Sequence, residues 1–390
     1  MILLIEKSEI VKNLTNVKLV LGNGFDCYCG LKTKYSDYFS FCRNEHINID
    51  KWKDSIKNAK EYLREISSNY LDLMSHIDLG DITFWDVYFY IVIKASDYNW
   101  CDIEEEMLQL LCKRQKNKPN IERIKFILTE KFKNLQDAID DEYILAACLK
   151  QKYSKIINEN NFYDLLLKEL KKFEKKFGNY INEQYEDNKH RFKSMANVFF
   201  RQITCNNDYI VSKDTFNYTN TFFDDDKNYK FLSGFTHVNG DYLNPIFGID
   251  STNVSPQSDV YRFTKTSRRM LSDMESLNDM PVTIIEDISN LFIFGHSLNE
   301  QDYSYFFPLF DYLKINNPLE NTKIVFIYSV YDETRKETIR KDVINRISKM
   351  VAAYDYYSTN HINGSRLLDY LTAKGRVILY EIKNLNVNYM

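Results

Sequence analysis

After Asn206 the sequence alternates between short apolar runs and longer amphipathic ones, and this alternation constrains the fold more than any other feature. Apolar runs rich in β-branched and aromatic residues are typical of buried strands, whereas apolar residues at three- and four-residue spacing are typical of helices. Strand, helix, strand and helix in succession predict a parallel sheet covered by helices on both faces. Strands are predicted at Tyr209–Val211, Thr215–Tyr218, Pro245–Gly248, Leu291–Phe294, Lys323–Tyr328 and, as a closing edge strand, Val377–Ile382; helices are predicted at Gln301–Ile315 and Glu333–Met350.

A first strand is predicted at Val17–Leu21, an apolar and partly β-branched run that stops at Gly22. From Tyr35 to Arg201 the pattern changes to lysine- and glutamate-rich stretches in which apolar residues follow helical spacing. We therefore expect an α/β fold with a Rossmann-like parallel sheet. Its core would be formed by residues 1–34 and 202–390, and residues 35–201 would be a large helical insertion after the first strand.

The composition excludes several classes of protein. Hydrophobic residues make up 44% and charged residues 27%, which supplies enough apolar surface for a core and argues against disorder. With 51 basic and 55 acidic residues, no overall field draws the chain to nucleic acid or anionic lipid. The seven cysteines include no Cys-x-x-Cys pair, which indicates a reducing compartment without a zinc site. Because no apolar stretch is long enough to span a membrane, we expect a cytoplasmic protein that needs no membrane.

The segment Gly22-Asn23-Gly24-Phe25-Asp26 follows the first strand directly and is the first candidate for ligand binding. Two glycines let a backbone turn tightly and approach a phosphate or a ribose closely. A standard dinucleotide fingerprint would need a third glycine where Cys27 stands, and no helix pattern begins directly afterwards. The segment is therefore either a ligand loop or a tight turn.

Two further candidates combine strands with polar side chains. Asn217, within Thr215–Asn220, follows a predicted strand, where an amide can fix a ribose hydroxyl or a water, or else cap the following helix. In an extended strand His237 and Asn239 would point to the same side, beside Gly240. His237 is then either a catalytic group or a structural histidine.

The fourth candidate is an apolar strand that ends in Gly295-His296-Ser297, with Asp302 on the helix that follows. Backbone amides in such a turn can bind an anion, and the alternative is a capped helix start with Ser297 or Asn299 as the cap. An acidic cluster, Asp102 with Glu104 and Glu105, lies in the helical region. These carboxylates suit a divalent metal, or a helix N-terminus whose dipole they complement.

The order of these segments resembles the AbiH abortive-infection family. Six short motifs carry the resemblance from about residue 17 to 330: Gly22–Asp26, Lys34–Asp37, Trp100–Glu104, Phe216–Thr221, the His237 segment, and Phe294–Leu298 with Asp302. This family is in turn similar to sirtuin-like domains. In those domains a first glycine loop, a Thr-Asn-Tyr-Asp-like strand end and a His-Gly strand surround NAD.

The resemblance implies a nucleotide pocket for NAD. In it Asn217 would position the nicotinamide ribose and a water, and Asn239 stands where relatives usually carry histidine. His237 would therefore serve as the base, or else the site binds a nucleotide without cleaving it. The cysteine-bound zinc module of true sirtuins is absent, so no metal is expected. The implied cofactor contacts are Gly22, Asn23, Gly24, Phe25, Asp26, Asn239, Gly240, Gly295, His296, Ser297 and Asp302.

Three functional hypotheses follow. The first is an abortive-infection effector that binds NAD or a related nucleotide and hydrolyses it once infection is sensed. The second is a module that senses a nucleotide or nucleic acid and triggers arrest by binding alone. The third is a metal-dependent nuclease that uses Asp102, Glu104 and Glu105. An effector of this kind would respond to a phage-derived trigger, and the helical insertion is a natural place for contacts of a homo-oligomer or for a lid.

Overall fold

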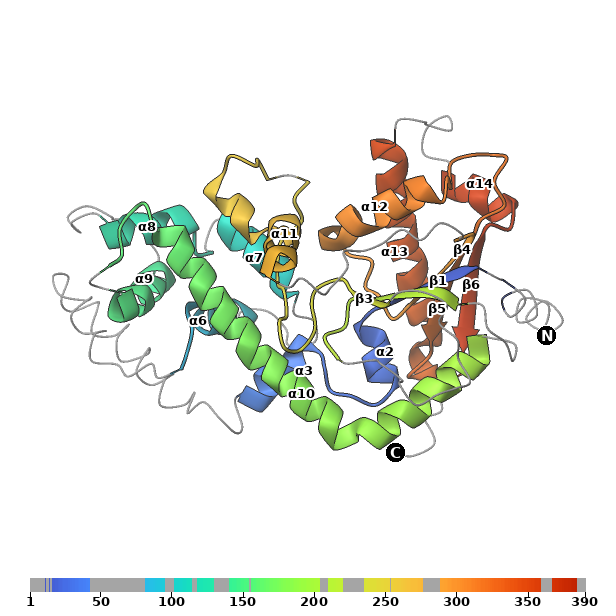
Figure 1. The fold of residues 1–390 in the computed structure, drawn as a ribbon, viewed down its shortest axis with the longest axis horizontal. Helices are drawn as coiled ribbons and strands as arrows, with labels where there is room; N and C mark the ends of the chain where they lie inside the picture. Colours follow the sequence, from blue (N-terminus) through green and yellow to red (C-terminus); the bar gives the residue numbers. More distant parts are fainter. Residues whose placement is uncertain are drawn as a thin grey trace. The chain divides into compact units, whose positions relative to one another are not determined.

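The structure is a computed structural model, shown in Figure 1. It describes residues 11, 14, 16–42, 81–94, 102–113, 118–129, 140–153, 156–203, 210–219, 235–252, 254–275, 288–358 and 367–383. The chain divides into two compact units. The sheet unit comprises Met1–Thr33, Gly178–Pro245 and Arg269–Met390, and the helical unit comprises Lys34–Phe177 and Ile246–Arg268. This division does not test whether residues 1–34 with 202–390, and 35–201, are separate folding modules, so those predicted domains stay a prediction.

Among the described residues, six strands form one sheet in the order β3-β2-β1-β4-β5-β6, and every neighbouring pair runs parallel. This confirms the predicted α/β fold with a Rossmann-like parallel sheet. The apolar strands lie where the sequence predicted them, and the last strand closes one edge. The strands are β1 (Val17–Leu21), β2 (Ile210–Thr215), β3 (Phe235–His237), β4 (Asn290–Phe294), β5 (Lys323–Ser329) and β6 (Val377–Ile382).

Strand β2 differs from the prediction of two short strands, because it is one strand with a polar centre. Ser212, Lys213 and Asp214 interrupt the apolar pattern, yet all three side chains are buried. Asp214 forms an ion pair of 2.7 Å with Lys18 on the neighbouring strand β1, and both side chains are 1% exposed. A buried charge that is paired in this way is tolerated inside a sheet. The polar residues of this segment therefore did not indicate a strand, although the strand lies inside the sheet.

The prediction of a strand at Pro245–Gly248 is wrong. The segment belongs to no strand, and only an isolated bridge joins the following Ile249 to Thr264. The backbone N–H of Phe247 donates to Glu174 Oε1 (2.7 Å), and its carbonyl accepts from Arg268 (2.7 Å). Side chains thus satisfy the backbone groups that a neighbouring strand would otherwise pair.

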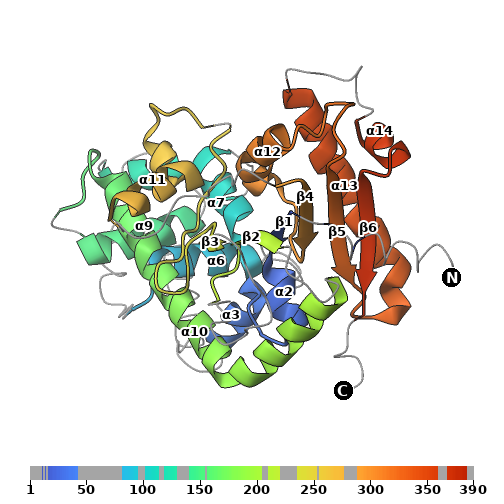
Figure 2. The same cartoon turned by 45° about the vertical axis from the view of Figure 1, so that its right-hand side comes forward.

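Each face of the sheet packs against its own set of helices, because successive side chains alternate between the faces. One face carries Val20, Ile293 and Phe326. It is covered by α12 (Tyr303–Tyr312), α13 (Lys336–Tyr357) and α14 (Leu367–Ala373), which Figure 2 shows beside the strands. The other face carries Leu21 and Phe294 and packs against α2 and the C-terminal part of α10. The helices of this unit are α2 (Asn23–Tyr28), the second part of α10 (Phe162–Ile203), the second part of α11 (Lys265–Glu275), η3 (Glu300–Asp302), α12 (Tyr303–Tyr312), η4 (Glu333–Arg335), α13 (Lys336–Tyr357) and α14 (Leu367–Ala373).

The helical unit confirms the helical pattern predicted between Tyr35 and Arg201 for the residues that the structure describes there. Its elements are α3 (Tyr35–Phe41), α6 (Phe84–Lys94), α7 (Ile103–Cys112), α8 (Ile121–Thr129), α9 (Asp140–Tyr153), the first part of α10, η2 (Asp259–Phe263) and the start of α11 (Lys265–Glu275). Of the helices that the structure describes, none combines the length and apolarity needed to cross a membrane.

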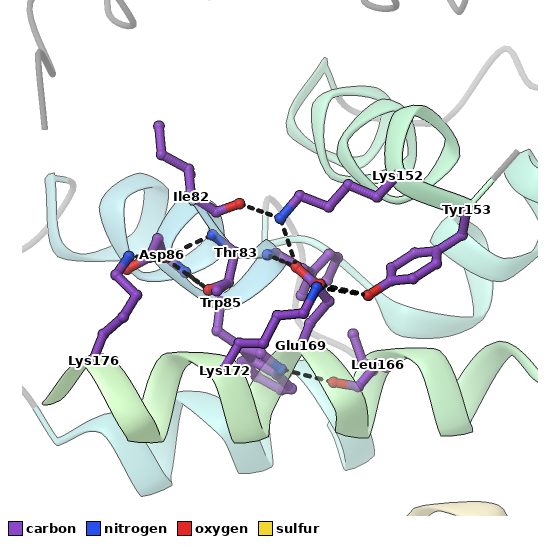
Figure 3. Close-up of polar contacts among 11 residues, drawn as sticks. Ile82, Thr83, Trp85, Asp86, Lys152, Tyr153, Leu166, Glu169, Lys172 and Lys176 are labelled. Atoms are coloured by element: carbon purple, nitrogen blue, oxygen red, sulfur yellow. Dashed lines mark hydrogen bonds and ion pairs between the residues drawn. The ribbon is translucent and has the colours of Figure 1, made fainter. Parts of the chain in front are cut away.

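A buried carboxylate joins three helices of this unit (Figure 3). Glu169 on α10 is fully buried and accepts from Phe84 N at the start of α6 (3.0 Å) and from the Tyr153 hydroxyl on α9 (2.7 Å). It also forms ion pairs with Lys152 (3.0 Å) and Lys172 (2.7 Å). Burial raises its pKa, but the hydrogen bonds and charges of these partners outweigh burial and hold the pKa below 4.5. The carboxylate is therefore a charged structural centre of the unit.

Candidate functional site

The predicted segments meet at one end of the strands, where the carboxyl ends of the parallel strands lie. Gly22 follows β1, Asn217 comes shortly after β2, His237 ends β3 and Gly295 follows β4. The chain fills one side of β1 with β2 and β3, and then crosses to the other side to form β4. In open parallel sheets, ligands bind outside the carboxyl ends of the strands at such a change of direction.

The carboxyl group of Asp26 is buried among the segments that follow the carboxyl ends of these strands. Its side chain is 1% exposed, and its Oδ1 accepts from Asn217 Nδ2 (2.8 Å) and from the Thr219 hydroxyl (3.0 Å). Burial raises the pKa of Asp26 to about 7, against the lowering effect of the hydrogen bonds from Thr219 and Asn217. The carboxyl therefore titrates near neutral pH. Thr219 was not among the predicted site residues, although it stands only two positions after Asn217.

Asn217 is held in one orientation. Its backbone N–H donates to the Thr215 hydroxyl (3.1 Å), and its side-chain nitrogen donates to Asp26. The side-chain oxygen Oδ1 is buried and accepts no hydrogen bond, and the residue as a whole is only 3% exposed. Buried amide oxygens are nearly always paired, so this acceptor is an exception, which it shares with Asn197 Oδ1 among the described residues. The side chain does not act as the helix cap that was the alternative for Asn217; Asn220 lies outside the described residues.

His237 is half-buried at the end of β3, and its Nδ1 lies 3.0 Å from the Asn217 carbonyl oxygen. A carbonyl only accepts, so Nδ1 carries the proton and Nε2 is the basic nitrogen of the neutral ring. The extended strand that would have aligned His237 with Asn239 ends at His237. Asn239 lies instead in the following turn, where Gly240 has a positive φ of 74°.

The glycines after β1 and β4 join two loops to each other. The Gly24 N–H donates to the Gly295 carbonyl (2.8 Å), and Gly22 bonds to Phe294 in the same way (2.9 Å). A Cβ on Gly24 would lie 2.6 Å from Gly295 Cα, and one on Gly22 would lie 2.5 Å from His296 Cα. Close backbone packing therefore accounts for these glycines without a ligand, and the predicted contact with phosphate or ribose stays a prediction.

The remaining residues of the first loop have structural partners. A short helix, α2, begins at Asn23, so most of the segment Gly22–Asp26 is helical and only Gly22 precedes the helix. The side chain of Asn23 binds to Thr33 through two hydrogen bonds: its Oδ1 accepts from the Thr33 hydroxyl (2.6 Å), and its Nδ2 donates to the Thr33 carbonyl (3.3 Å). Phe25 is fully buried in the core and packs edge-on against Phe199 and Phe294.

Both ring nitrogens of His296 make polar contacts with other residues of the loop. Its Nδ1 accepts from the Leu298 N–H (2.8 Å), which leaves the proton of the neutral ring on Nε2, 3.3 Å from Asp302 Oδ2. The ring packs against Phe216, with centroids 4.3 Å apart. His296 and Asp302 are thus suited to fixing the loop after β4, and Ser297, which directly follows His296 in this loop, is half-buried.

The acidic cluster serves the helical unit. Asp102 caps α7, because its Oδ1 accepts from the backbone N–H groups of Glu104 and Glu105 (3.1 Å each). Glu104 pairs with the buried Lys265 at 2.7 Å. Within the described ranges no three His, Cys, Asp or Glu side chains gather as a metal site would need. These contacts agree with the helix-cap interpretation; Trp100 and Cys101 lie outside the described residues.

Comparison with known proteins adds one finding. No curated protein and no solved structure matches the chain. The family model described as bacteriophage abortive infection AbiH matches residues 19–328, which run from β1 into β5. Since this match covers well over half of the 390 residues, the chain belongs to the bacteriophage abortive infection AbiH family.

Proposed function

We propose that this chain is an abortive-infection effector that binds NAD, or a related nucleotide, at the carboxyl ends of β1–β3 and hydrolyses it. Its family supports the role in phage defence. The observation that carries the nucleotide proposal is the buried Asn217 Oδ1, which accepts no hydrogen bond while Asp26 fixes the amide from the other side. A ribose offers hydroxyl donors of the kind that such an acceptor binds.

The proposed reaction is hydrolysis of the bond between nicotinamide and ribose. Water attacks the ribose carbon C1′, and the bonding electrons pass to the positively charged ring nitrogen, which leaves as neutral nicotinamide. His237 Nε2 takes the proton of the attacking water, because Nδ1 already donates to the Asn217 carbonyl. Nicotinamide, ADP-ribose and one proton are the products, so the reaction needs no other reactant.

The test is nicotinamide release from NAD by the purified protein, with and without phage lysate. Asn217→Ala and His237→Ala are expected to lower the rate by about 10²–10⁴-fold, the range for loss of a general base or a positioned donor or acceptor. Asn197→Ala is the matched control for the amide, because Asn197 Oδ1 is also buried without a hydrogen bond but lies on α10. His190→Ala removes an exposed histidine of the same helix. Both controls should retain the wild-type rate.

Two results would contradict the proposal: NAD that stays intact under every condition, or cleavage that persists in both site variants. A specific observation favours binding without cleavage as the second candidate. Asn239, which stands where the relatives usually carry histidine, is occupied by a hydrogen bond to Arg269 (3.1 Å) and is no base. In that case NAD would bind to the purified protein and be recovered unchanged. The nuclease hypothesis gains no support, since Asp102 and Glu104 have structural partners.

A further inference from the structure

The side-chain amide of Asn217 is fixed with its nitrogen facing the protein. Its Nδ2 donates to Asp26 Oδ1 at 2.8 Å, while its Oδ1 accepts no hydrogen bond. Without such a contact an amide can rotate by half a turn and exchange its oxygen with its nitrogen, because its two ends have nearly the same shape. Asp26 therefore determines which end of the amide is left for another group.

Asp26 presents an acceptor to Asn217 in both of its protonation states. The Thr219 hydroxyl lies 3.0 Å from each oxygen of the carboxyl group. When Asp26 is ionised, its Oδ1 has lone pairs for both Asn217 and Thr219. When Asp26 is neutral, the proton sits on Oδ2 and can donate to the Thr219 oxygen, since Oδ1 already accepts two hydrogen bonds. The amide thus keeps one orientation although the pKa of Asp26 is about 7.

The backbone that carries the amide is also fixed. The Asn217 N–H donates to the Thr215 hydroxyl (3.1 Å), and the Phe216 N–H donates to the Leu21 carbonyl on the neighbouring strand (2.8 Å). Thr215 is the last residue of β2 and is fully buried. The amide can therefore adjust only by rotation about its own side-chain bonds, and the hydrogen bond to Asp26 opposes that rotation.

We infer that Asp26 is a positioning residue that turns the oxygen of the Asn217 amide toward the ligand, so that the site selects a sugar with a free hydroxyl group. An amide oxygen pairs with a hydroxyl donor, whereas a deoxy sugar leaves this buried acceptor unpaired. This inference rests on the proposed function, since it names the sugar contact of the same site. It gives Asp26 a role that acts through Asn217, and it narrows the substrate class to ribonucleotides over their deoxy analogues.

The experiment measures kcat/KM for NAD and for two analogues whose nicotinamide ribose lacks either the 2′- or the 3′-hydroxyl. The discrimination ratio is the value for NAD divided by that for an analogue, and it is compared between variants so that the intrinsic reactivity of the analogue cancels. Asp26→Leu fills the space without an acceptor and should lower the ratio for one analogue by about 10- to 100-fold, as expected for loss of a buried hydrogen bond. Asp26→Asn keeps an acceptor for Asn217 and a donor for Thr219, and should retain most of the discrimination.

Two further variants separate positioning from loss of stability, and the melting temperature of every variant is measured in parallel. Thr219→Val removes the hydroxyl group that holds the Asp26 carboxyl, and should lower the ratio in the same direction by a smaller factor. Asp355→Leu removes a carboxyl group that is 3% exposed on α13 of the same unit. It should leave the ratio at the wild-type value even where it lowers the melting temperature. If Asp26→Leu does not fold, Thr219→Val decides the question.

The outcomes separate this inference from the proposed function. If Asp26→Leu and Thr219→Val discriminate as wild type does, or if Asp26→Asn loses as much discrimination as Asp26→Leu, the inference is overturned and the proposed function stands. If wild type binds NAD in calorimetry without cleaving it, the ratio is taken from the dissociation constants. A ratio that depends on Asp26 then supports the inference while hydrolysis fails. If wild type neither binds nor cleaves NAD, or binds NAD and both analogues with equal affinity, the inference is overturned.

Discussion

Asp26 and Asn217 lie 191 positions apart in the chain and are joined by a hydrogen bond of 2.8 Å. The helical region between them separates β1 from β2 in sequence, yet the two strands are neighbours in the sheet. Both residues follow the carboxyl ends of these strands, so the parallel pairing brings them together. The pair couples a carboxyl that titrates near neutral pH to the amide proposed to hold the ligand.

The first prediction concerns stability against pH. The pKa of Asp26 is about 7 in the folded protein against 3.8 for the ordinary side chain. Between these values the folded chain holds a proton that the unfolded chain releases, so rising pH favours unfolding. Relative to Asp26→Asn, which cannot titrate, wild type should lose on the order of 4 kcal/mol from about pH 4 to pH 7, at about 1.4 kcal/mol per unit of pKa. The difference should then stay constant above pH 7.

Urea denaturation of both proteins across this range checks the prediction. Asp369→Asn, at an exposed carboxyl on α14, is the control and should show no such trend. A difference between wild type and Asp26→Asn that does not change with pH would show that Asp26 is ionised throughout.

The second prediction tests the packing of the two loops. Gly295 and Gly375 both have a positive φ, 70° and 64°. A Cβ on Gly295 would lie 2.5 Å from Phe25 N, whereas one on Gly375 would meet nothing within 4 Å. Gly375→Ala should therefore cost only the backbone strain of about 1 kcal/mol, while Gly295→Ala should cost about 3 kcal/mol or more. Equal losses in the free energy of unfolding would mean that the loops separate without cost.

The third prediction concerns the buried carboxylate of the helical unit. Glu169→Gln leaves Lys152 and Lys172 without their charged partner, and should lower the free energy of unfolding by about 2–4 kcal/mol. Glu186→Gln on the same helix removes an exposed pair with Lys189 and should cost less than about 1 kcal/mol. Because the pKa of Glu169 lies below 4.5, its contribution is present above that value and is lost as pH falls through the folded pKa. Chemical denaturation at pH 7 and at pH 3 measures both effects; equal losses for the two variants at pH 7 would contradict this role.

Apolar strands were predictable and the polar one was not. β1, β4 and β5 have largely buried side chains, most of them apolar, and β6 is mostly apolar in sequence although most of its side chains are only partly buried. The sequence pattern reveals all four strands directly. In β2 the charged residues Lys213 and Asp214 are buried, although such residues in a sequence are typical of an exposed loop. The ion pair between Asp214 and Lys18 forms only between two strands that are far apart in sequence. Hydrophobic periodicity carries no signal for such a pair.

The candidate site was predictable in part for the same reason. The sequence indicated strand ends that meet, and it selected Asp26, Asn217 and His237, which the structure joins by hydrogen bonds. It did not reveal the contact of Arg269, which lies on α11 outside every motif and donates to Asn239 Oδ1. Nor could it show that Gly22 and Gly24 serve contact between two loops, since a tight turn, a ligand loop and a loop contact all require glycine.

We propose that infection triggers consumption of NAD at the site formed by Asn217 and His237. The most direct test is total NAD in phage-infected bacteria that express wild type, Asn217→Ala or His237→Ala at equal protein levels. NAD is expected to fall before lysis with wild type only, and both variants should keep NAD near the uninfected level and release more phage. NAD that stays at the uninfected level while the wild-type culture still arrests would contradict NAD consumption at this site.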